Sequence, residues 1–183
     1  MKKKDDIRLL NSGELEDFFI SKNQKKYRVS QVLDWIWCKG VDSFSQMSNL
    51  SDNLRKLLDK KFDLKKPIEV KSHKSSDGTV KYSIQLYDGN YVEAVLIPNK
   101  NRITACISSQ VGCSLDCKFC ATSRLVRKRN LLFYEIFDQI FYLSEQSKIL
   151  FERKISNVVF MGMGEPLLNY SNVVKAVRKI KLK

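Results

Sequence analysis

The sequence has few of the features on which small secreted proteins and membrane proteins depend. It contains five cysteines in 183 residues and no secretory signal peptide, which argues against a disulfide framework and favours a reducing cytoplasm. No apolar run is long enough to cross a membrane, and no basic amphipathic helix with an aromatic face favours a membrane surface. The single histidine, His73, lies in a polar stretch typical of an exposed loop. We therefore expect a cytoplasmic protein without a membrane partner.

Three of the five cysteines lie close together, in a C-x3-C-x2-C spacing that no later cysteine follows: Cys113, Cys117 and Cys120. Three thiolates can hold three irons of a cubane iron–sulfur cluster, whereas a closed ferredoxin-type cluster uses four. The remaining iron is then available for chemistry, while a purely structural metal site closes its coordination sphere. The alternative is a zinc site with His73 as the fourth ligand. The spacing disfavours zinc, because zinc sites usually pair their cysteines as C-x2-C.

Two further segments have patterns that are informative about structure and only weakly about function. Residues 157–169 begin as a short β-branched run typical of a buried strand and end in glycines, where a backbone can approach a ligand closely. Residues 91–98 are typical of a half-buried strand, on which Glu93 alone would be expected to face solvent. Cys106 precedes the cysteine cluster, and an isolated cysteine there is ordinarily a small buried hydrophobic residue.

The charge of the chain favours a polyanionic partner. Its formal net charge is +13, and each lysine or arginine that neutralises a phosphate releases a counterion. Four basic residues follow the cysteines closely and are candidates for contacts with RNA phosphates: Arg124, Arg127, Lys128 and Arg129. A general preference for lysine on a solvated surface would give the same total charge. The charge therefore supports a nucleic-acid partner without establishing one.

Taken together, these motifs resemble a known family. The three-cysteine loop, with Phe119 before its last cysteine, is similar to the cluster loop of the radical S-adenosylmethionine (radical SAM) superfamily. The segment Gly162-Met163-Gly164-Glu165-Pro166-Leu167-Leu168-Asn169 resembles the adenine-C2 methyltransferases of ribosomal and transfer RNA, the RlmN family. The segment from Tyr91 to Pro98 resembles the V-E-x-V-x-I-P signature of the same family.

The resemblance implies a function and a set of site residues. Cys113, Cys117 and Cys120 would hold a [4Fe–4S] cluster, S-adenosyl-L-methionine would bind at its open iron, and an electron donor such as flavodoxin would reduce it. The product would be 2-methyladenine in 23S rRNA and tRNA. By the same resemblance, Glu93 would be the acid/base residue, Gly164 and Glu165 would receive the methionine amine, and Cys106 would form a transient disulfide. Met161 and Met163 are expected to fill the core.

Two alternatives to this function stay open. The related C8 methyltransferases of the Cfr type more typically have alanine after the glutamate, so Pro166 favours the C2 branch. The second alternative is that the chain is a catalytically dead remnant that binds RNA or a cluster.

The expected architecture is α/β, a partial radical SAM (βα) barrel preceded by a β-hairpin and a small helical domain. We expect a helical RNA-binding accessory domain over residues 1–65, with helices over 13–20, 30–37 and 51–58. Residues 66–101 are expected to form a linker, to Gly78, and then a hairpin. Residues 102–183 are expected to begin the barrel, with a helix from about Leu131 capped by Asn130, a strand near 157–160 and a final amphipathic helix.

A complete barrel needs about 250 residues. We therefore expect an incomplete chain, without the C-terminal cysteine that the family methylates. It would be a fragment, a split gene product that a second chain could complete, or the product of a truncated reading frame. On this expectation the 183 residues alone do not complete methyl transfer.

Overall fold

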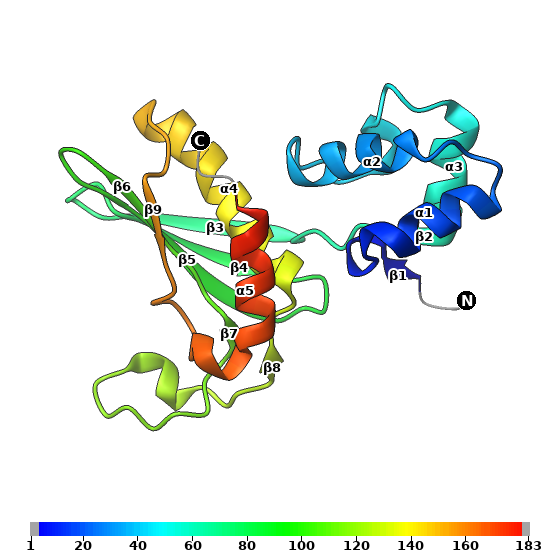
Figure 1. Ribbon diagram of the computed structural model, residues 1–183. Coiled ribbons are helices and arrows are strands. Elements are labelled where there is room, and N and C mark those ends of the chain that lie inside the picture. Colours follow the sequence, from blue (N-terminus) through cyan, green and yellow to red (C-terminus); the bar gives the residue numbers. More distant parts are fainter. Residues whose placement is uncertain (1–3, 181–183) are drawn as a thin grey trace. The chain divides into compact units, whose positions relative to one another are not determined.

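The computed structural model describes residues 4–180, which divide into two compact units at Lys65 and Lys66 (Figure 1). The first unit is mainly helical, and the second contains the principal sheet with two α-helices. The α/β class predicted from the sequence is therefore confirmed. None of the helices in this described part of the chain combines the length and the apolar character that crossing a membrane requires.

The first unit is built from three helices around an apolar core. The helices are α1 (Ser12–Ser21), α2 (Tyr27–Trp37) and α3 (Asp52–Lys61). Short 3-10 helices η1 (Ile7–Leu9) and η2 (Phe44–Gln46) and the parallel pair β1 (Asp5–Asp6) and β2 (Phe62–Asp63) complete it. The core includes residues from all three helices: Leu15, Phe19, Val32, Ile36, Leu54 and Leu58. The second helix begins three residues before the expected Ser30, with no side-chain cap.

The second unit contains a five-stranded sheet in the order β3-β4-β5-β6-β9. Its strands are β3 (Glu69–Lys74), β4 (Val80–Gln85), β5 (Tyr91–Pro98), β6 (Ile103–Cys106) and β9 (Asn157–Val159). Neighbours are antiparallel except β6 and β9, which are parallel. The β4–β5 pair is the predicted hairpin. A separate short pair, β7 (Gln110–Val111) and β8 (Arg129–Asn130), closes the base of the cysteine loop.

Strand β3 corrects the expectation of a linker and exposed loop between residues 66 and 78. Residues 69–74 pair with β4 along their whole length, from Glu69 opposite Gln85 to Lys74 opposite Val80. An edge strand needs backbone partners on one side only, so a polar sequence with little apolar alternation is sufficient for it. His73 lies on this strand and is exposed, as expected of a surface histidine.

Two helices pack on one face of the sheet. They are α4 (Phe133–Phe151) and α5 (Tyr170–Lys179), preceded by the 3-10 helices η3 (Ala121–Arg124) and η4 (Pro166–Asn169). The core joins both helices to the alternate residues of the strands: Val92, Ala94, Leu96, Ile103, Ala105, Ile136, Ile140 and Ala176. The cap of α4 is Leu132 rather than Asn130, and the Glu135 carboxylate accepts a hydrogen bond from the Leu132 backbone N–H at 2.8 Å. The order β6–α4–β9–α5 is the expected beginning of a βα barrel.

Candidate functional site

The face of the sheet opposite α4 carries two of the predicted site residues. Along β5, Val92, Ala94 and Leu96 are buried against the helices, so Glu93 and Val95 lie on the other face. Cys106 is the cross-strand partner of Val95. Because directly opposed residues of an antiparallel pair share a face, Cys106 lies on the same face as Glu93. The strand periodicity thus places the proposed acid/base residue and the proposed disulfide cysteine on one surface.

Glu93 has an ion partner that the sequence did not reveal. The Lys81 Nζ lies 3.0 Å from Glu93 Oε1, and both side chains are about half exposed. Lys81 is on β4, where Ser83 is the direct cross-strand partner of Glu93. The two charged residues are therefore diagonal neighbours, which is within reach of long side chains. Strand alternation on β4 is the signal that would have placed Lys81 on this face.

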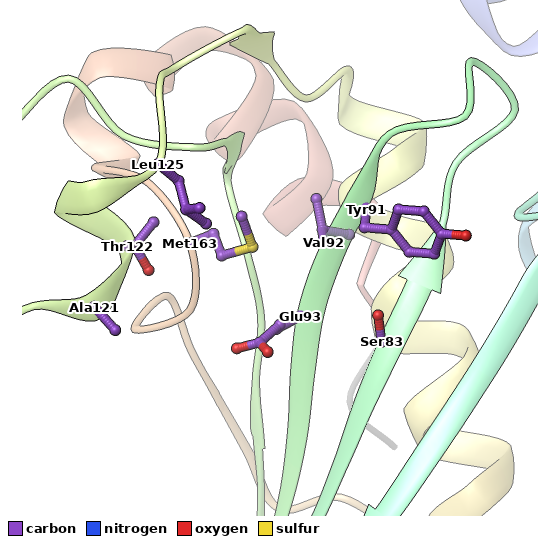
Figure 2. Close-up of a pocket in the computed structure, with 8 residues that line it drawn as sticks. All are labelled: Ser83, Tyr91, Val92, Glu93, Ala121, Thr122, Leu125 and Met163. Atoms are coloured by element: carbon purple, nitrogen blue, oxygen red, sulfur yellow. The ribbon is translucent and has the colours of Figure 1, made fainter.

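A pocket of about 390 Å³ opens beside Glu93, which is the size of a small-molecule site. Its lining comes from three segments far apart in the sequence: Ser83, Tyr91, Val92, Glu93, Ala121, Thr122, Leu125 and Met163. Figure 2 shows the Glu93 carboxylate extending from its strand toward the side on which Ala121, Thr122 and Met163 lie. Ala121 directly follows Cys120, and Met163 belongs to the glycine-rich segment. The pocket therefore lies where Glu93, the residues that follow the cysteine motif and Met163 of the glycine-rich segment meet.

The glycine-rich segment lies directly against the chain that leaves β6. The backbone N–H groups of Ser109 and Gln110 both donate to the Met163 carbonyl, at 2.9 and 3.2 Å. Gly164 has a φ of +90°, and a Cβ there would lie 2.4 Å from the Gln110 side chain. The Gln110 Oε1 accepts from the Glu165 backbone N–H at 3.0 Å. Gly164 is thus required for both conformation and space.

The Glu165 carboxylate serves its own loop, because it accepts a hydrogen bond from the Leu167 N–H at 3.0 Å and caps η4. Gly164 and Glu165 adjoin Met163 but do not themselves line the pocket. Met163 is buried, as expected, whereas Met161 is 80% exposed and does not fill the core. The expectation for Met161 is therefore wrong.

Cys106 is separate in character from the three clustered cysteines. It is buried, and burial raises the pKa of its thiol, against a hydrogen bond from the Met161 backbone that acts to lower that pKa. Its sulfur is free of any disulfide. Cys113, Cys117 and Cys120 are instead half-buried and also free. Backbone N–H groups of Thr122 and then Ser123 lower the pKa of the Cys120 thiol, which favours a thiolate.

The cysteine loop is held at its ends and exposed between them. Cys113 forms an isolated β-bridge with Val126, and Gly112 lies so close to Val126 that a Cβ would be 2.3 Å from the Val126 carbonyl oxygen. Phe119 is 94% exposed. Within residues 4–180, no group of three cysteine, histidine or acidic side chains is gathered closely enough to hold a metal ion. The structure thus brings the three cysteines onto one loop without assembling their sulfurs.

The basic run after the cysteines divides into two kinds of residue. Arg129 binds Glu135 through paired contacts at 2.7 and 2.8 Å, and its Nε lies 2.7 Å from Asp88. Although burial acts to lower it, these two carboxylates raise the pKa of Arg129. The Lys128 Nζ donates to Asn90 in the same β4–β5 turn, at 2.9 Å. Arg129 and Lys128 therefore connect the end of the cysteine loop to the hairpin.

Arg124 and Arg127 are exposed and differ from this pair. Arg127 donates to Asn130 at 3.0 Å, while Arg124 has no protein partner among the described residues. Lys128 is exposed as well but donates to Asn90, so Arg124 and Arg127 are the exposed residues of the four that make no hydrogen bond to the hairpin in the described part of the chain.

Comparison with known proteins agrees with these motifs. Residues 6–64 match the family described as ribosomal RNA large subunit methyltransferase N-terminal domain, and residues 107–183 match the radical SAM superfamily. A protein of Flavobacterium psychrophilum named "Probable dual-specificity RNA methyltransferase RlmN" is 51% identical over 97% of this chain and 51% of its own length. A Marinobacter nauticus protein named "Dual-specificity RNA methyltransferase RlmN" is 46% identical over 90% of this chain and 45% of its own.

A solved structure supports the fold. The crystal structure of a radical SAM methyltransferase from Sphaerobacter thermophilus superimposes with a TM-score of 0.83 at 31% identity, covering 95% of this chain and 51% of that one. This likeness confirms the partial radical SAM fold with its preceding hairpin and helical domain. The chain spans about half the length of the curated relatives it matches. The chain is therefore similar, over nearly all of its own length, to about half of the length of the RlmN proteins, with one segment matching their N-terminal domain and one matching the radical SAM superfamily.

Proposed function

We propose that this chain is part of a radical SAM methyltransferase that forms 2-methyladenine in 23S rRNA and tRNA. It would provide the residues that bind the iron–sulfur cluster and the glutamate that accepts the proton. The observation that supports this most directly is the pocket, where Glu93 meets the residues that follow Cys120 and the glycine-rich segment. The names of the relatives supply the RNA substrate class. An electron donor such as a flavodoxin and a cytoplasmic location belong to the same proposal.

The donor set fits an iron–sulfur cluster in its chemistry. Cys113, Cys117 and Cys120 are free, partly accessible and on one loop, and the lowered pKa of Cys120 favours the thiolate that a metal needs. These three residues would hold a [4Fe–4S] cluster, with Gly164 and Glu165 beside the methionine amine of S-adenosylmethionine. Bound there, the cluster and S-adenosylmethionine would supply reductive carbon–sulfur cleavage and hence a carbon radical.

Glu93 would serve as the proton acceptor of the reaction. Its carboxylate extends toward the pocket, so an adenine of the RNA bound there would be within reach of it (Figure 2). The Lys81 Nζ lies 3.0 Å from Glu93 Oε1 and pairs with this carboxylate on the same face of the sheet. Cys106 lies on the same face of the sheet, where a thiol would be available for the transient disulfide.

The metal is tested by anaerobic reconstitution of the chain with iron and sulfide. We expect about four irons per chain, because three thiolates leave a site-differentiated cubane. Adding S-adenosylmethionine should change the EPR signal of the reduced cluster. Stoichiometric zinc with no uptake of iron under these conditions would contradict the proposal.

The role of Glu93 as proton acceptor is tested by the substitution Glu93→Gln in the complete gene product. Turnover should fall by about 10²–10⁴-fold while iron content and cofactor binding are retained, because only the proton acceptor is removed. A protein–RNA adduct should accumulate, and gel analysis would detect it. Glu145→Gln, an exposed glutamate on α4 that pairs with Lys148, is the matched control and should retain activity. Wild-type turnover in Glu93→Gln would return Glu93 to the class of ordinary strand residues.

A further inference from the structure

Ser108 occupies the point at which the two halves of the candidate site meet. It is fully buried and lies two residues after Cys106, the last residue of β6. Its hydroxyl donates to the Glu93 carbonyl oxygen at 2.6 Å and accepts from the Met163 backbone N–H at 2.8 Å. One oxygen atom therefore connects the strand that carries the proposed base to the glycine-rich segment.

The backbone of Ser108 is fixed independently of its side chain. Its N–H donates to Gln139 Oε1 at 2.9 Å, and its carbonyl accepts from Gln139 Nε2 at 3.1 Å. Gln139 is fully buried on α4. A buried amide with both ends paired to one residue holds that residue in a single orientation. The helix thus sets where the Ser108 hydroxyl stands.

The local geometry explains why a small hydroxyl residue is needed at this position. Pairing between β5 and β6 ends at Val95 and Cys106, so Glu93 lies beyond the end of that ladder. On the other side, Gly162 lies so close that a Cβ on it would be 2.7 Å from Ser108 Oγ. Only a short side chain that both donates and accepts can fill this gap.

Ser109 provides an internal contrast. It is buried to the same degree as its neighbour, yet its hydroxyl has no hydrogen-bond partner within the described part of the chain. Its backbone makes the contacts instead, through its N–H to Met163 and its carbonyl from Asn169. The two adjacent buried serines therefore differ in whether the side-chain hydroxyl is hydrogen-bonded.

We propose that Ser108 is a positioning residue whose hydroxyl fixes the glycine-rich segment relative to Glu93. If the segment receives the methionine end of S-adenosylmethionine, as the proposed function holds, Ser108 sets the place of that cofactor relative to the base. Loss of the hydroxyl removes the acceptor of the Met163 N–H and the side-chain link to β5, so the segment keeps its contacts with residues 107–110 but should open more often. Ser108 acts through Met163 and Glu93 and has no direct contact with substrate in this role.

The first test needs no cofactor. Hydrogen exchange is measured by mass spectrometry on the wild-type chain, Ser108→Ala and Ser109→Ala. In Ser108→Ala, amides of residues 161–165 should exchange about tenfold faster, since one buried hydrogen bond has a net value near the free energy of a tenfold change. Ser109→Ala should exchange like wild type. Equal protection of this segment in all three proteins would overturn the proposal.

A second variant covers the case in which Ser108→Ala does not fold. Ser108→Cys keeps nearly the same volume and leaves a thiol, which is a weak donor and a weak acceptor. Measured under reducing conditions, its exchange in residues 161–165 should lie between those of wild type and an unprotected segment. Wild-type protection in Ser108→Cys would show that the hydroxyl is not required.

A further experiment, with the cluster and S-adenosylmethionine bound, distinguishes failure of this proposal from failure of the proposed function. After anaerobic reconstitution, Ser108→Ala and Ser109→Ala should take up as much iron as wild type. The affinity for S-adenosylmethionine, read from the change in the EPR signal, should be about tenfold weaker in Ser108→Ala alone. If the wild-type chain takes up no iron, the proposed function is contradicted. The positioning role of Ser108 is then tested by hydrogen exchange alone, which needs no cofactor. Equal affinity in both variants overturns the positioning role while the proposed function stands.

Discussion

The candidate site consists of two neighbouring regions that are stabilised in opposite ways. The segment from Ser108 to Gln110 is almost completely buried, and its polar groups bind α4 and the glycine-rich segment. The cysteine loop begins only three residues later, yet Phe119 is 94% exposed and Val126 is 84% exposed. One region is fixed by internal hydrogen bonds, and the other is attached at its two ends.

This difference separates stability from chemistry within one site. Substitutions in the buried segment should lower stability, because they create steric overlap or leave buried polar groups unpaired. Substitutions of the cysteines should leave stability nearly unchanged, because the loop contributes little to the core. The following predictions test that separation.

The largest effect is expected from the cysteines. Replacing any one of Cys113, Cys117 or Cys120 by alanine should abolish uptake of a four-iron cluster, since each would supply an iron ligand. The free energy of unfolding of the metal-free chain should change by less than about 0.5 kcal/mol. Iron analysis and urea denaturation measure the two quantities. Cys38→Ala, at the exposed cysteine after α2, is the control and should retain iron.

The next effect is expected from Gly162→Ala in the buried region. The new Cβ would lie 2.7 Å from both the Ile107 carbonyl and Ser108 Oγ, and the Ile107 backbone cannot easily move. We expect a loss of about 2 kcal/mol, with a melting temperature lower by about 5 °C.

Gly89→Ala is the matched control for this substitution. Gly89 has a positive φ of +81° but open space around its Cβ position. Its cost should therefore be conformational only, about 1 kcal/mol. A larger loss for Gly89→Ala than for Gly162→Ala would show that close packing of the glycine-rich segment does not contribute as described.

Regular patterns in the sequence predicted much of the fold. Residue alternation predicted the β4–β5 hairpin, and apolar spacing predicted α3 and α5. The same patterns could not predict β3, because its pairing depends on backbone groups rather than on its polar side chains. They also misplaced the cap of α4, since the Glu135 carboxylate reaches back to Leu132 in place of a cap by Asn130.

The candidate site was less accessible to sequence reasoning for a different physical reason. Glu135 and Gln139 look like the solvent side of an amphipathic helix, yet both are buried on α4. Their partners are Arg129 and the Ser108 backbone, which only the tertiary fold brings to the helix. The adjacent Ser108 and Ser109 are chemically identical in the sequence, and geometry alone distinguishes them.

A smaller effect is expected from the connection between the cysteine loop and the hairpin. Burial acts to raise the pKa of Asp88, but hydrogen bonds from Arg129 and Asn90 and the Arg129 charge lower it from 3.8 to about 2. A lowered pKa stabilises the fold above the unfolded value, and this stability is lost as the pH falls from about 4 to 2. Asp88→Asn should remove roughly 1 kcal/mol of stability at pH 7. Below pH 2 its stability should approach wild type. Parallel curves for both proteins between pH 7 and 2 would contradict this account.

The smallest effect on stability is expected from Arg124, and Arg129 of the same basic run is its comparison. Arg124 is exposed without a protein partner among the described residues, whereas Arg129 binds Asp88 and Glu135. Arg124→Gln should therefore leave the melting temperature unchanged. If Arg124 contacts a phosphate of the proposed RNA substrate, its removal should weaken RNA binding and reduce the salt dependence of binding by about one counterion. Arg129→Gln should lower the melting temperature by several degrees, because it leaves the buried Glu135 carboxylate without its partner. Titration of RNA binding against salt and thermal unfolding measure both variants. A lower melting temperature in Arg124→Gln would show that this exposed residue does stabilise the fold. An unchanged melting temperature in Arg129→Gln would show that its ion pairs with Asp88 and Glu135 do not.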